Sequence, residues 1–64
     1  MRDIIQFIGA KGSARIEDVF DIFPSKTMEM VREDLRKVVR KGYIRWDERN
    51  MIVLTMKGER FYDE

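Results

Sequence analysis

The sequence predicts a mainly helical domain with one small antiparallel β-hairpin, an α+β class. A long amphipathic segment, 25–41, carries apolar residues at helical spacing. Two runs of aromatic and β-branched residues, 43–46 and 51–54, flank the polar stretch 47–50, which is typical of a hairpin. Because the 64 residues contain no repeat and no linker-like segment, we expect a single domain over residues 1–64.

The first expected element is a helix over 2–11, in which Ile4, Ile5 and Ile8 share one face. Phe7 lies off that face, so it either packs against the C-terminal helix or forms a dimer contact. Residues 13–15 are expected to form an extended link or a minimal strand. A second helix is expected over 16–23, with its apolar residues at three- and four-residue steps: Ile16, Val19, Phe20 and Phe23.

Pro24 is expected to end the second helix, because the residue before a proline is pushed out of helical geometry. Ser25 can then cap the next helix after a turn of about three residues, which is typical of a helix-turn-helix. The third helix is expected to reach about Lys41 before Gly42 adopts the left-handed conformation that ends many helices. Its predicted buried stripe consists of Met28, Val31, Leu35, Val38 and Val39.

The remaining elements are the hairpin and a short last helix. The strands are predicted over 43–46 and 51–54, with the turn at 47–50. Thr55 can cap a final helix that extends to about Tyr62. Trp46 either packs on its neighbours in the hairpin or contacts a ligand.

The composition is unfavourable for catalysis. The chain has no Cys and no His, so it lacks thiolate metal ligands and the usual general base. It also has no glycine-rich phosphate loop in a suitable context. We therefore expect no enzyme activity, no bound metal and no cofactor.

The sequence also predicts a cytoplasmic protein without membrane insertion. Segment 1–9 is short for a signal peptide and carries Asp3. No apolar run approaches the roughly 20 residues that cross a bilayer. Charged residues make up 39% of the chain and Gln6 and Asn50 are its only side-chain amides, a composition typical of thermophilic proteins.

The order of elements resembles a winged helix-turn-helix domain of the MarR and PadR type of transcriptional regulator. Two segments carry the resemblance. One is the basic pair and glycine before an apolar strand, Arg40-Lys41-Gly42-Tyr43-Ile44, and the other is Leu54-Thr55-Met56-Lys57-Gly58. The resemblance implies a DNA-binding transcriptional regulator. Its third helix, about 25–41, would read the major groove, and its wing, about 43–55, would contact the backbone.

The resemblance also implies a set of contact residues and a partner. The partner is double-stranded DNA, bound by a homodimer because two half-sites raise affinity and specificity. The dimer surface is expected at Phe7, Phe61 and Tyr62. The expected nucleic-acid contacts are Ser25, Lys26, Thr27, Met30, Arg32, Lys37, Arg45 and Arg49.

Charge is distributed unevenly along the chain. Residues 25–42 have six bases and three acids, a net charge of +3, whereas segments 1–24 and 43–64 each carry −1. The positive segment also contains Glu29 and Glu33, which disfavour phosphate binding. Their pairing with Arg32 and Lys37 at helical spacing would make this a solvated face. Alternatively, both acids form a protein-docking face with Met30, in a winged-helix interaction module that does not bind DNA.

Overall fold

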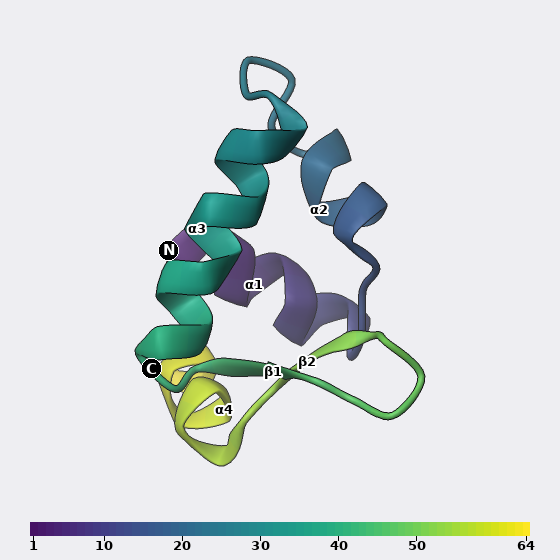
Figure 1. Ribbon diagram of the computed structural model, residues 1–64. Helices are drawn as coiled ribbons and strands as arrows, with labels where there is room; N and C mark the ends of the chain where they lie inside the picture. Colours follow the sequence, from purple (N-terminus) through teal and green to yellow (C-terminus); the bar gives the residue numbers. More distant parts are fainter.

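The computed structural model describes residues 1–64 and contains four helices and one two-stranded antiparallel sheet (Figure 1). In chain order the elements are α1 (Arg2–Lys11), α2 (Ile16–Asp21), α3 (Met28–Arg40), β1 (Ile44–Trp46), β2 (Ile52–Leu54) and α4 (Met56–Asp63). The predicted order of elements and the α+β class are confirmed.

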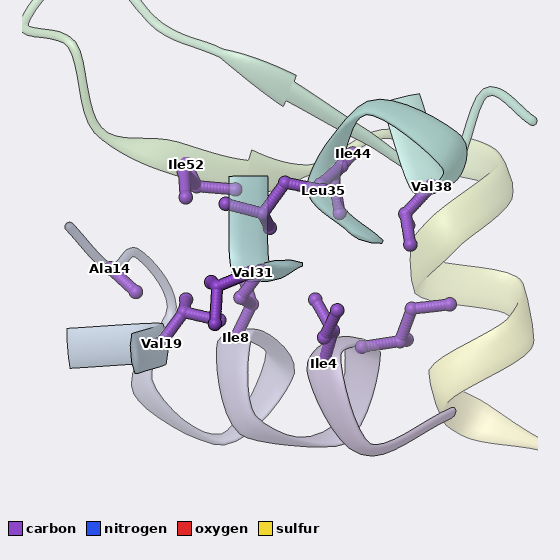
Figure 2. Close-up of a cluster of buried hydrophobic side chains, with 10 residues drawn as sticks. Ile4, Ile8, Ala14, Val19, Val31, Leu35, Val38, Ile44 and Ile52 are labelled. Atoms are coloured by element: carbon purple, nitrogen blue, oxygen red, sulfur yellow. The ribbon is translucent and has the colours of Figure 1, made fainter. Parts of the chain in front are cut away.

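One apolar core joins all parts of the fold. Side chains from α1, α2, α3 and the hairpin converge on it (Figure 2), and α1 also packs against α4. The predicted burial of the three isoleucines of α1 is confirmed. The ten core residues are Ile4, Ile5, Ile8, Ala14, Val19, Val31, Leu35, Val38, Ile44 and Ile52.

Two of the residues predicted to lie on the buried stripe of α3 are not fully buried. Val39 is 37% exposed, so its predicted burial is wrong, and Met28 is half-buried. The cause for Val39 is geometric, because it lies on the flank of α3 that faces the hairpin and the start of α2. That flank borders an open groove, and the core contacts the neighbouring flank.

The connection between α2 and α3 is longer than predicted. It spans six residues, 22–27, because α2 ends at Asp21 and α3 begins at Met28. The chain after Asp21 tightens into i→i−3 hydrogen bonds, with Ile22 and Phe23 donating to Val19 and Phe20. The prediction that Ser25 caps α3 is wrong, because the Thr27 side chain accepts the Met30 N–H at 3.2 Å.

The hairpin carries a third, one-residue strand. In the hairpin, β1 and β2 are paired with Ile44 opposite Leu54 and Trp46 opposite Ile52. Each of these two strands is one residue shorter than predicted. The Ala14 N–H donates to the Ile52 carbonyl at 3.0 Å, and the Ile52 N–H donates back at 2.7 Å. The extended link expected over 13–15 therefore holds the start of α2 against the hairpin.

The end of α3 and the start of α4 are joined at one corner. Gly42, with φ of 85°, takes the left-handed conformation predicted for it. The Gly42 and Tyr43 N–H groups donate to the Val39 and Val38 carbonyls, which makes a Schellman motif. The Thr55 hydroxyl donates to the Gly42 carbonyl and, as predicted, caps α4 by accepting the Gly58 N–H.

The close approach of α4 to the Tyr43 carbonyl requires a glycine at position 58. A Cβ built at Gly58 would lie 1.9 Å from the Tyr43 carbonyl oxygen, which is backbone and cannot rotate away. We expect Gly58→Ala to lower the free energy of unfolding by about 1–3 kcal/mol. Helix propensity alone would favour alanine over glycine by about 1 kcal/mol, so the sign of the change separates the two effects.

Chemical denaturation of Gly58→Ala measures this change, and Met56→Ala is the matched control. Met56 lies in the same first turn of α4 and is 73% exposed, so its truncation should leave stability nearly unchanged. A Gly58→Ala protein as stable as the wild type would show that α4 does not need this close approach.

Candidate functional site

An arginine-lined groove of about 1080 Å³ lies between α3, the start of α2 and the hairpin. Figure 1 shows α2 and the turn of the hairpin on the same side of α3. Glu17 is the one acid in the lining. The five arginines of the groove are Arg15, Arg32, Arg36, Arg40 and Arg49.

Helix geometry places three of these arginines on one flank of α3. Arg32, Arg36 and Arg40 follow one another at intervals of four residues, so they lie along the same side of the helix. Arg36 donates to Glu33 at 2.9 Å in an exposed ion pair. Because such pairs contribute little in water, the Arg36 guanidinium is available to a stronger anionic ligand.

Strand alternation divides the side chains of the hairpin between two surfaces. Trp46 lies on the same face of β1 as buried Ile44 and lines the arginine groove. Arg45 points to the other face, where it lines a separate hollow with Asp47 and Glu59. The hairpin thus has a basic, aromatic surface toward α3 and a more acidic surface toward α4.

Asp47 organises the turn that carries Arg49 to the groove. Its Oδ1 accepts the backbone N–H groups of Arg49 at 2.8 Å and Met51 at 2.9 Å. Asn50 takes a left-handed conformation within this turn, with φ of 60°. The Met51 N–H, followed by the Arg49 N–H and the charges of Arg49 and Arg45, lowers the pKa of Asp47 below 3.8, although desolvation opposes the shift.

The structure places three of the expected contact residues on the connection before α3. Ser25 is exposed there, and the Thr27 hydroxyl is engaged as the cap of α3. The Lys26 ammonium lies 2.5 Å from Asp34 Oδ2 and 4.7 Å from the centre of the Phe23 ring. Lys26 therefore already has an anionic partner within the fold.

The other expected contact residues do not form one surface. Arg32 and Arg49 lie together in the groove, whereas Met30 and Lys37 are exposed outside its lining. The ion pairs expected for Glu29 with Arg32 and for Glu33 with Lys37 are replaced by the pair of Glu33 with Arg36.

The residues expected at a dimer surface make contacts within the protein. Phe61 packs on Tyr43 with ring centres 5.0 Å apart, and the Arg2 guanidinium lies 5.4 Å from the Phe61 ring. Tyr62 covers Gly9, where an added Cβ would lie 2.5 Å from its ring. Phe7 is half-buried against the core. A homodimer through these residues stays a prediction.

Three arginines of the groove were absent from the expected contacts: Arg15, Arg36 and Arg40. Trp46, expected either to pack within the hairpin or to contact a ligand, also lines the groove. The spacing of Arg32, Arg36 and Arg40 was a usable signal, because it aligns them on one helix flank. The position of Arg15 depends on the Ala14–Ile52 bridge, which local sequence patterns do not reveal.

Comparison with models of known protein families, with curated proteins and with solved structures finds no match. None of the four helices combines the length and apolar character needed to cross a membrane.

Truncating Asp47 should destabilise the fold in a pH-dependent manner. A depressed pKa means that the folded state favours the carboxylate, so its stabilising effect is complete above about pH 3.8. That effect is lost as pH falls through the lower folded-state pKa. We expect Asp47→Ala to lower the thermal midpoint at pH 7 and the difference from wild type to narrow below pH 3.8.

Thermal unfolding followed by circular dichroism across this pH range measures the difference. Glu48→Ala is the control, since Glu48 is an exposed acid in the same turn without a hydrogen bond. A constant Asp47→Ala difference at all pH values would show that the charge of Asp47 does not stabilise the turn.

Proposed function

We propose that this protein is a small winged helix-turn-helix DNA-binding protein, acting as a transcriptional regulator, and that it binds DNA through the arginine groove. The observation that carries the proposal is the convergence of five arginines and only one acid on a single groove. Arginine binds phosphate with a planar fork of donors. A polyanionic backbone is the partner that matches such a lining.

The arrangement of elements supports the winged-helix assignment. Three helices precede a hairpin, and the bridge between Ala14 and Ile52 adds the short extra strand. The hairpin leaves the end of α3 at a corner fixed by Thr55 and Gly58. As a result α3 and the hairpin border the same groove, which is the arrangement needed for a helix and a wing to contact one duplex.

The groove also explains how a chain with a net charge of +1 would bind DNA. Net charge averages the whole surface, whereas phosphates respond to the local field. Asp34 is paired with Lys26 and Asp47 with backbone N–H groups. These acids therefore act in the fold and do not line the groove with the arginines.

A second candidate function is a winged-helix protein-interaction module. The exposure of Met30 favours it, because this side chain is 50% exposed on α3 outside the groove. With Glu29 and Glu33 nearby on the helix, Met30 would give a partner protein a mixed apolar and acidic surface.

The salt dependence of binding tests the DNA proposal. For the wild type we expect the logarithm of the affinity for a duplex to fall with the logarithm of salt concentration, by about 0.9 per phosphate contacted. In the double variant Arg36→Ala and Arg40→Ala, the slope should fall by about 1.8 as two contacts are lost. Fluorescence anisotropy of a labelled duplex at several salt concentrations measures both.

The double variant Lys37→Ala and Lys41→Ala is the matched control. It removes the same charge from the same end of α3, but neither lysine lines the groove. Its slope should change by less than that of the arginine variant. Equal slopes in the two variants would place the binding surface elsewhere, and an absence of duplex binding at low salt would favour the protein-interaction module.

A further inference from the structure

We propose that the arginine groove accepts an unpaired base against Trp46, so that the preferred ligand is duplex DNA with a single-stranded tail. This inference rests on the proposed function, because it names the form of DNA that the same groove prefers. It begins with Trp46, the only tryptophan of the chain. Its side chain is 43% exposed and lines the groove among the arginines.

The position of Trp46 in β1 explains why it is exposed. Ile44 and Trp46 project from the same face of the strand, but Ile44 reaches the core and Trp46 lies beyond it. Val39, 37% exposed on α3, lines the same groove. The groove thus combines exposed apolar surface with a cationic lining. A ligand that carries a flat apolar group between anionic groups would use both the indole of Trp46 and the arginines.

An unpaired nucleotide has these properties, whereas a paired one offers only some of them. In a duplex the faces of the bases are covered by their neighbours, and proteins reach only the base edges and the phosphates. An unpaired base can place its face on an indole ring while arginines hold the flanking phosphates. The groove volume of about 1080 Å³ is sufficient, since pockets for small ligands occupy roughly 300–1,000 Å³.

Arg32 and Arg49 are positioned to bind the phosphates that flank the unpaired base. Arg49 follows Trp46 in the hairpin turn held by Asp47, and Arg32 comes from α3. Phosphates on either side of the unpaired base would then meet guanidinium groups from two different elements. The hairpin and α3 would act together on a tail that leaves the end of a duplex.

Three labelled DNA ligands test the inference with the wild-type protein. They are a blunt duplex, the same duplex with a short single-stranded tail, and that tailed duplex with abasic sites in the tail. The abasic ligand keeps the phosphates and removes the bases. Stacking of one base corresponds to about a 5- to 150-fold change in affinity, so the abasic tail should bind weaker than the normal tail by a factor in this range.

Trp46 itself reports the contact. Since it is the only tryptophan, protein emission should be quenched by the normal tail and little changed by the abasic tail or the blunt duplex. Trp46→Ala should remove the preference for the normal tail over the abasic tail, and Trp46→Phe should retain part of this preference. Arg45→Ala, on the other face of the hairpin, should retain all of it.

The outcomes separate this inference from the proposed function. If the blunt duplex binds with the expected salt dependence but normal and abasic tails bind equally, the inference is wrong and the proposed function stands. If only ligands with an intact single-stranded tail bind, the stacking inference stands and duplex recognition is wrong. If no ligand binds at low salt, both are wrong.

Discussion

The Thr55 hydroxyl joins the last turn of α3 to the first turn of α4, because it donates to the Gly42 carbonyl and accepts the Gly58 N–H. Lys57 adds a hydrogen bond of 2.8 Å to the Lys41 carbonyl, which satisfies a further acceptor at the end of α3. The missing side chain of Gly58 lets α4 approach the Tyr43 carbonyl. Together these contacts fix the direction in which the hairpin leaves α3, and the groove between them depends on that direction.

The same corner gives the Leu-Thr-x-Lys-Gly segment a structural explanation. Thr55, Lys57 and Gly58 each contact the backbone of residues 41–43. In the sequence this segment supported a resemblance to DNA-binding regulators, yet its residues do not line the groove. The segment therefore bears on the fold, and the proposed function depends instead on the arginines.

Local sequence patterns predicted the helices well, but they predicted the cap of α3 and the residues of the groove less well. The bounds of α1 and the cap of α4 followed from apolar spacing and from Thr55, both of which are short-range features. The cap of α3 was misplaced because Ser25 and Thr27 are both suitable cap residues, and tertiary packing decides between them. The groove required the pairing of Ala14 with Ile52 and the facing of Trp46 toward α3, which are contacts between segments distant in the sequence.

The hairpin also separates two electrostatic environments that the net charge of +1 conceals. Arg49 and Trp46 face the arginines of α3. Arg45 lies instead with Asp47 of the hairpin turn and with Glu59 of α4. Alternation along a three-residue strand is sufficient to produce this separation, because successive side chains point to opposite faces. A shift of one residue in the pairing would exchange the two sets. The Asp47 turn and the Ala14 bridge, which fix that register, are therefore as important to the proposed site as the arginines.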